Sequence, residues 1–219
     1  MNRSSTLILA SLLLGATACD KAEQPAAKQA QADAPVPAEP EVEAPAPAEA
    51  PAATVASGLA PGMRFAAFEI LNCETGDQYC QVCKYGPNPK IMAVGTIDDA
   101  DFQEDLEQLD ALVAKLGNDR VKAFAVIAEE KDGALVTPVA DKDALLAKAK
   151  AMREELGISM PVVLPAPKGD GQNGTFEDHY KISKSRTIMF ADGKNEVHYS
   201  EVAPSDYAGL ETKIGEVVG

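Results

Sequence analysis

Tryptophan is absent from this chain, histidine occurs twice, and aromatic residues make up only 5% of the 219 positions. A hydrophobic core must therefore be built mainly from aliphatic side chains. The sequence also has no glycine-rich phosphate loop, no Gly-x-Ser-x-Gly nucleophile motif and no His-Glu-x-x-His zinc motif. These absences remove the sequence support for the common nucleotide-binding, hydrolase and metalloprotease classes.

Basic residues are outnumbered by acidic ones, and the net charge is −14. An acidic surface is repelled by phosphate backbones and by anionic lipid headgroups. We therefore expect no nucleic-acid partner.

The first 18 residues have the organisation of an export signal. A short basic start is followed by an apolar stretch at 7–14 and by small residues at 15–18, directly before Cys19. The apolar stretch is too short to be a retained membrane-spanning helix. This arrangement resembles the lipobox of bacterial lipoproteins, although Ala16 stands where leucine is usual. The resemblance implies a lipid on Cys19 and a membrane-anchored protein of the cell envelope that faces the periplasm. An ordinary signal peptide cleaved nearby is the alternative.

Residues 19–57 are dominated by alanine, proline and glutamate and have almost no large apolar side chain. Such a segment cannot bury enough apolar surface to offset the entropy lost on ordering, so we predict a disordered tether. The remaining residues, 58–219, have the length of one domain and can enclose a core.

Hydrophobic periodicity in this domain predicts strands that alternate with helices. The expected order is an edge strand at 63–71, a cysteine-bearing loop at 72–89, a buried strand at 90–97, an aspartate-capped helix ending at 116, a strand at 121–128, a helix at 141–156, a strand at 161–164, a glycine-rich loop at 169–174, a helical turn at 176–180, a hairpin at 187–202 and a helix at 206–218. The acidic pairs at 98–99 and 129–130 are interpreted as caps and turns rather than as catalytic carboxylates. This order predicts an α/β sandwich.

The order resembles the redoxin branch of the thioredoxin fold, and three short stretches carry the likeness. These are the entry segment 60–62, the aspartate-capped helix, and the run from Tyr180 into the hairpin at 187–193. The resemblance implies a three-layer sandwich with a mixed central sheet and a thiol–disulfide oxidoreductase activity. Two positions depart from the pattern. No cysteine occurs at 97–99, where the family's catalytic cysteines would fall, and neither Ser185 nor Arg186 is the expected cis-proline.

The cysteines lie instead before the core strand. Cys80 and Cys83 form a Cys-x-x-Cys pair, and Cys73 lies in the same predicted loop. If Cys19 carries a lipid, three thiols remain. They allow three single bridges, 73–80, 73–83 and 80–83, and the sequence does not choose among them.

The first hypothesis is thiol–disulfide exchange with a protein partner at Cys80 and Cys83, with Cys73 as a candidate third thiol. Lys84 would favour a neighbouring thiolate through its charge, whereas the glycine and prolines at 86–89 prevent a long helix after Cys83. By resemblance alone, Cys80 would attack and Cys83 would resolve.

Two alternatives remain open. In the first, a disulfide pins the loop of a non-catalytic binding or scaffold module. In the second, Cys73, Cys80 and Cys83 bind zinc or copper with a fourth ligand from His179 or His198, although both histidines lie far along the chain. We predict no resident cofactor.

Overall fold

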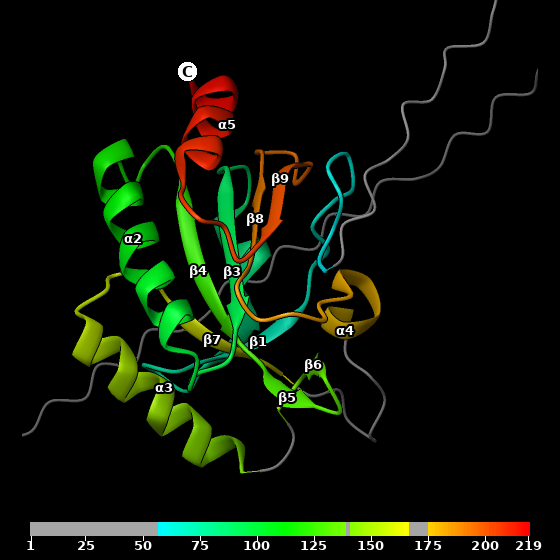
Figure 1. Ribbon diagram of the computed structural model, residues 1–219, viewed down its shortest axis with the longest axis vertical. Helices are drawn as coiled ribbons and strands as arrows, with labels where there is room; N and C mark the ends of the chain where they lie inside the picture. The colour runs from blue at the N-terminus through cyan, green and yellow to red at the C-terminus, as the bar shows by residue number, and fades with distance from the viewer. Residues whose placement is uncertain (1–56, 139–140, 167–174) are drawn as a thin grey trace, which may run out of the picture. The chain divides into compact units, whose positions relative to one another are not determined.

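The computed structural model describes residues 57–138, 141–166 and 175–219 (Figure 1). The predicted signal peptide, Cys19, the predicted tether up to residue 56 and the glycine-rich loop at 169–174 lie outside the described residues.

A seven-stranded mixed sheet forms the centre of the domain, in the order β2-β1-β7-β4-β3-β8-β9. The strands are β1 (Glu69–Asn72), β2 (Gln78–Cys80), β3 (Lys90–Gly95), β4 (Lys122–Ile127), β7 (Val162–Pro165), β8 (Thr187–Ala191) and β9 (Val197–Val202). β3, β4 and β7 are mutually parallel, whereas β1, β2, β8 and β9 each pair antiparallel with a neighbour. A separate two-stranded hairpin consists of β5 (Glu129–Lys131) and β6 (Ala134–Val136).

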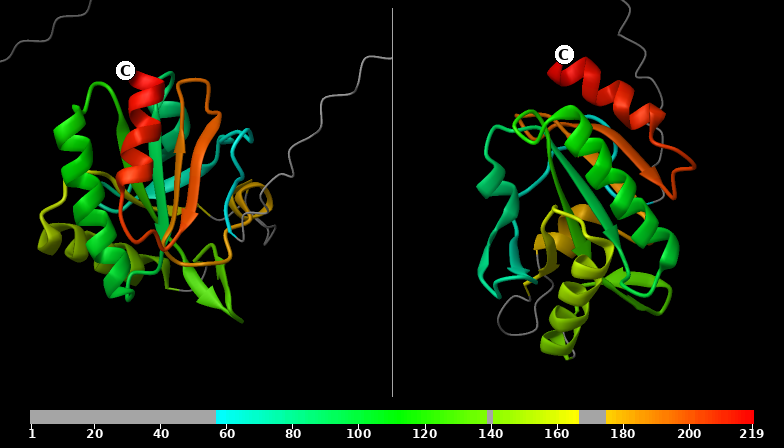
Figure 2. Two further views of the ribbon diagram at one scale, coloured as in Figure 1. Left: turned by 45° about the horizontal axis from the view of Figure 1, so that its top comes forward. Right: turned by 90° about the vertical axis from the view of Figure 1, so that its left-hand side faces the viewer.

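Helices cover both faces of the sheet. They are α1 (Gln81–Tyr85), α2 (Ala100–Leu116), α3 (Lys142–Leu156), α4 (Thr175–Tyr180) and α5 (Ala208–Val218). Side chains of α2, α3 and α5 pack into one hydrophobic cluster, and those of α1 and α4 pack into a second cluster on the opposite face. Figure 2 shows α1 and α2 on opposite sides of the sheet. The predicted three-layer sandwich with a mixed sheet is therefore confirmed.

The central strand β3 and the helix after it follow from local sequence. Every residue of β3 is buried, as its continuous apolar run predicts. Asp99 caps α2 by accepting a hydrogen bond from the Phe102 N–H at 3.2 Å, and Gly117 ends the helix. The last residue of β3 is Gly95, and a larger residue would not fit there because its Cβ would lie 2.6 Å from the Phe102 ring.

Lys90 is fully buried at the start of β3, although its charge disfavours burial. Its Nζ donates hydrogen bonds to the Gly86 carbonyl and to the Asn195 side chain. Burial lowers the pKa of Lys90, and the Asp192 carboxylate partly opposes that effect. The lysine thereby ties the segment after α1 to the β8–β9 turn.

The N-terminal part of the domain differs from the prediction. Of the expected strand at 63–71, only residues 69–71 belong to β1, and Arg64 makes only an isolated bridge with Glu196. β1 is not at the edge, because the chain turns back after Asn72 and adds β2 outside it. The expected loop at 72–89 therefore contains a strand and a short helix.

The β5–β6 hairpin was also missed. Its turn contains Asp132 and Gly133, both with positive φ, which is the backbone that an Asp-Gly hairpin turn requires. The acidic segment interpreted as a solvated turn is thus the first strand of that hairpin.

Candidate functional site

Cys80 and Cys83 are joined by a disulfide, with their Cα atoms 5.2 Å apart. Cys80 is the last residue of β2 and the N-cap of α1, and its Sγ accepts a hydrogen bond from the Cys83 N–H at 3.1 Å. The pair therefore lies at a strand-to-helix junction that begins at an edge strand. α1 has five residues and ends at Gly86, as the glycine and prolines predict. So short a helix supplies only a small dipole to a thiolate at its N-terminus.

The two bridged cysteines have different surroundings. Cys83 is exposed, whereas Cys80 is half-buried and packs against the α1-side hydrophobic cluster. The exposed Lys84, next to Cys83 in the chain, places its Nζ 4.6 Å from the centre of the ring of Tyr79, the residue before Cys80. Tyr85 fixes the other end of α1 by donating a hydrogen bond to the Ala123 carbonyl at 2.7 Å.

The structure does not bring Cys73 to the bridge. Cys73 is 6% exposed and belongs to the hydrophobic cluster on the α2, α3 and α5 face. Burial raises the pKa of the Cys73 thiol to about 12, although the Arg153 charge partly opposes the shift. A neutral, enclosed thiol on the other side of the sheet is poorly placed to resolve or shuttle the Cys80–Cys83 disulfide.

The ligand set of the metal hypothesis is not assembled either. Two of its cysteines are bonded to each other. His179, in α4, lies 2.6 Å from the Arg64 carbonyl, and His198, in β9, lies 3.4 Å from Asp192. Within the described ranges, no three His, Cys, Asp or Glu side chains are arranged to hold a metal ion.

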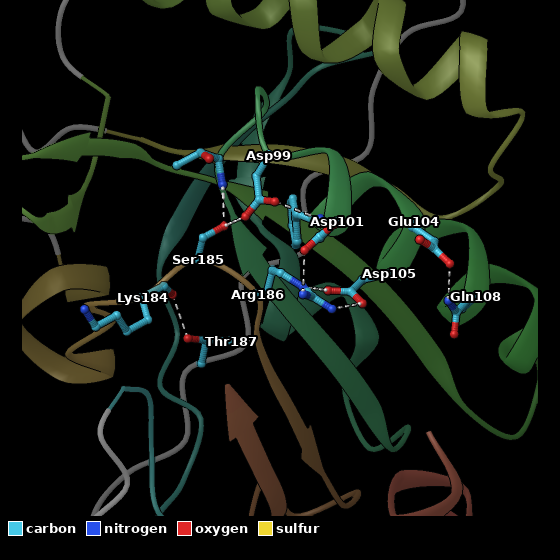
Figure 3. A network of polar contacts seen from close by, with 11 residues as sticks. Asp99, Asp101, Glu104, Asp105, Gln108, Lys184, Ser185, Arg186 and Thr187 are labelled. Atoms are coloured by element: carbon cyan, nitrogen blue, oxygen red, sulfur yellow. Dashed lines mark hydrogen bonds and ion pairs between the residues drawn. The ribbon is translucent and has the colours of Figure 1, made fainter. Parts of the chain in front are cut away.

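The place where the resemblance puts the redox cysteines holds a polar network instead (Figure 3). Asp99, after the end of β3, accepts a hydrogen bond from the Ser185 hydroxyl at 2.6 Å. The same hydroxyl oxygen accepts the Thr96 N–H at 3.3 Å. The two positions that depart from the family pattern therefore contact each other, and they link β3 to the segment before β8.

Arg186 extends this network along α2. Its guanidinium donates to both oxygens of the buried Asp105 at 2.7 and 3.1 Å, and to Asp101 at 3.1 Å (Figure 3). The hydrogen bonds with Asp105 raise the pKa of Arg186. We did not predict this cluster from the sequence. Its signal is the spacing of the two aspartates, which places them on one side of the helix.

The disulfide and the polar network lie far apart in the sheet. β1, β7 and β4 lie between β2, which carries the disulfide, and β3, which leads into the polar network. Because the strands of a sheet are about 4.8 Å apart, this order puts β2 roughly 19 Å from β3. The network therefore has no direct contact with the bridge.

The described domain is similar to solved proteins of the thioredoxin fold. A thiol-disulfide isomerase from Corynebacterium glutamicum superposes with a TM-score of 0.56 at 14% identity, over 72% of this chain and 97% of that one. The thioredoxin domain of a thiol-disulfide oxidoreductase from Bacteroides vulgatus gives a TM-score of 0.55 at 14% identity, over 74% and 99% of the two chains. A thiol:disulfide interchange protein from Chlorobium tepidum gives 0.50 at 12% identity, over 74% and 99%.

These likenesses show the fold, which is the thioredoxin-like fold expected from the sequence. No protein-family model and no curated protein matches the chain. Among the helices of the described ranges, none has the length and apolar character needed to cross a membrane.

Proposed function

We propose that this protein is a thiol–disulfide oxidoreductase that exchanges disulfides with a protein partner through Cys80 and Cys83. The observation that carries the proposal is the exposed residue Cys83, bonded to a Cys80 sulfur that already accepts a backbone N–H at a helix N-terminus. That N–H would stabilise a thiolate on Cys80 when the bridge opens.

The oxidising direction proceeds in two exchanges. A thiolate of the partner attacks the Cys83 Sγ, the Cys80–Cys83 bond breaks, and Cys80 leaves as a thiolate. The partner's second thiol then loses its proton and attacks the partner's first sulfur in the mixed disulfide. This attack releases Cys83 as a thiolate. Two electrons thus pass from the partner's dithiol to the protein, and the partner gains a disulfide. The reverse sequence reduces a partner disulfide.

In this proposal the different exposure of the two cysteines decides which one reacts with the partner. A bulky partner reaches Cys83 before the half-buried Cys80, so the mixed disulfide forms on Cys83 and Cys80 closes the bridge again. This assignment is opposite to the one that the resemblance implies. Cys80→Ser should accumulate a partner on Cys83, whereas Cys83→Ser should trap far less, as seen by mass spectrometry of the mixed disulfides.

The activity is tested by insulin reduction and by redox titration of the bridge. Cys80→Ser and Cys83→Ser should abolish turnover, and Cys73→Ser, the matched control, should leave it unchanged. The proposal requires a reduction potential above about −300 mV, the upper limit typical of structural disulfides. A potential well below that value, together with no turnover, would contradict it.

A second function is favoured by the polar network of Asp99 and Ser185, which lies where the resemblance places the redox site (the usual redox corner). In that case the domain is a non-catalytic binding module, and the bridge only holds α1 against the sheet. A loop this short contributes about 2 kcal/mol in the chain-entropy model. This alternative expects Cys80→Ser to lower the melting temperature, with no exchange activity in the unaltered protein.

We also propose that Cys19 carries a lipid and that residues 19–57 tether the domain, at 58–219, to a membrane on its periplasmic side. The support is the order of basic, apolar and small residues before Cys19. Mass spectrometry of the mature protein should find Cys19 as an acylated first residue. Cys19→Ser should move the protein from the membrane fraction to the soluble fraction, and unchanged fractionation would contradict the anchor.

A further inference from the structure

β2 is the outermost strand of the sheet on its side and ends at the redox pair. Within the part of the chain that the structure describes, β2 pairs with β1 alone. An edge strand presents backbone N–H and C=O groups that another extended chain can pair with. The question is which groups of β2 face that open edge.

The hydrogen-bond register between β1 and β2 shows which backbone groups of β2 face the open edge. Asn72 lies opposite Asp77, and its N–H donates to the Asp77 carbonyl at 2.9 Å. Directly opposed residues exchange hydrogen bonds only at every second pair of an antiparallel ladder. Ile70 and Tyr79 are therefore the next bonded pair, and the pairs that contain Gln78 and Cys80 are not bonded across the ladder.

The other side of β1 supports the same assignment independently. The Cys73 N–H donates to the Val162 carbonyl at 3.0 Å, and the Glu69 carbonyl accepts the Ala166 N–H at 2.8 Å. The odd-numbered residues of β1 thus bond toward β7, which leaves the even-numbered residues to bond toward β2. It follows that the backbone N–H groups of Gln78 and Cys80 point away from β1, at the open edge.

We propose that this edge binds an extended, cysteine-containing segment of the partner protein, which adds to β2 as a further strand. Gln78 offers both an N–H and a C=O, and Cys80 offers a further N–H two residues along. A segment paired in this way runs alongside the disulfide, so its own cysteine can reach the exposed Cys83. The proposal rests on the exchange function proposed above and names how its partner is held.

The size of the edge favours a transient partner over a second copy of this chain. β2 has three residues, whereas a stable interface buries more than about 1,000 Å². Weak pairing suits a substrate that is then held by a mixed disulfide. The exposed Lys84 beside the bridge further favours a segment that carries an acidic side chain near its cysteine.

Gln78→Pro tests the edge, because proline removes the outward N–H but no N–H of the β1 ladder. The matched control, Gln78→Ala, keeps that N–H. With a disulfide-linked peptide substrate, Gln78→Pro should lower kcat/KM about five-fold, the value of one hydrogen bond, and Gln78→Ala less than about two-fold. The reaction of both variants with dithiothreitol, which cannot form a strand, should match that of the unaltered protein. Equal kinetics of the two variants with the peptide would overturn the proposal.

A second measurement does not depend on how the proline variant folds. The full chain, labelled with ¹⁵N, is titrated with a peptide whose cysteine is replaced by serine. Binding should slow hydrogen exchange at the Gln78 and Cys80 amides, and N-methylation of alternate peptide residues should abolish binding in one register only.

Unchanged exchange at both amides overturns the docking edge even if turnover is normal. Peptide binding without turnover supports the edge and overturns the exchange function. Protection of Gln78 in the protein alone, with a dimer in sedimentation, overturns the proposal in favour of self-pairing.

Discussion

At the scale of the residue, Asp99 stands where the resemblance places a redox cysteine, and in this protein its side chain stabilises the structure. One carboxylate oxygen caps α2 and the other accepts the Ser185 hydroxyl. Replacement by alanine removes both contacts, so Asp99→Ala should lower the free energy of unfolding by about 1–2 kcal/mol. Urea denaturation measures the change. The adjacent, exposed Asp98 is the control, and Asp98→Ala should change stability by less than about 0.5 kcal/mol. Equal effects of the two variants would rule out the capping role.

The Cys73 thiol should react very slowly with alkylating reagents in the folded protein. With a pKa of about 12, its thiolate fraction at pH 8 is on the order of 10⁻⁴. After reduction of the bridge, iodoacetamide should modify Cys83 within minutes and leave Cys73 unmodified until urea is added. Because the folded pKa is raised, modification of Cys73 should accelerate as the pH rises toward 10. Peptide mapping by mass spectrometry follows each site, and labelling of Cys73 as fast as Cys83 would contradict its burial.

At the scale of the element, Arg186 joins α2 to the segment before β8. Arg186→Met leaves the buried Asp105 carboxylate without its cationic partner, so we expect a loss of about 3 kcal/mol in the free energy of unfolding. Adding Asp105→Leu removes the stranded charge and should recover most of that loss. A thermal or urea double-mutant cycle checks this. Additive effects of the two substitutions would show that the ion pair does not couple the two elements.

The elements that the sequence predicted well are those with strong local signals. β3 is a continuous apolar run, α2 has an aspartate cap and a closing glycine, and the β8–β9 hairpin has an Asp-Gly turn. The strands that were missed, β2, β5 and β6, have three residues each. So short a segment shows no periodicity, and its existence depends on a partner strand that the local sequence does not reveal.

The same distinction applies to the candidate site. The Cys-x-x-Cys pair, the helix stop at Gly86 and the loss of the usual redox corner could all be predicted from local residues. Which bridge forms could not, because it depends on the side of the sheet that each cysteine faces. Cys73 follows the side-chain alternation of β1, whereas Cys80 ends a strand whose existence was not expected.

At the scale of the whole molecule, the thioredoxin-like domain has its disulfide and its conventional redox corner on different strands. Because distant sites act independently, Ser185→Ala should leave the rate of exchange at Cys80 and Cys83 within about two-fold. The variant should still lose stability, since the Asp99 and Thr96 contacts disappear. Parallel measurement of turnover and unfolding separates the two effects. A large loss of turnover at unchanged stability would place the chemistry at the conventional corner instead.

The position of Cys73 also has a consequence for how the chain matures. In an unfolded chain, three thiols within eleven positions can pair in three ways, and nothing but proximity selects among them. Once β1 is inserted between β2 and β7, the sheet separates Cys73 from the other two, and one pairing remains. The folded sheet thus selects the Cys80–Cys83 pairing. A molecule that meets an oxidant before its sheet has formed can be locked into a pairing that the native fold does not accommodate, so correct maturation depends on folding preceding oxidation.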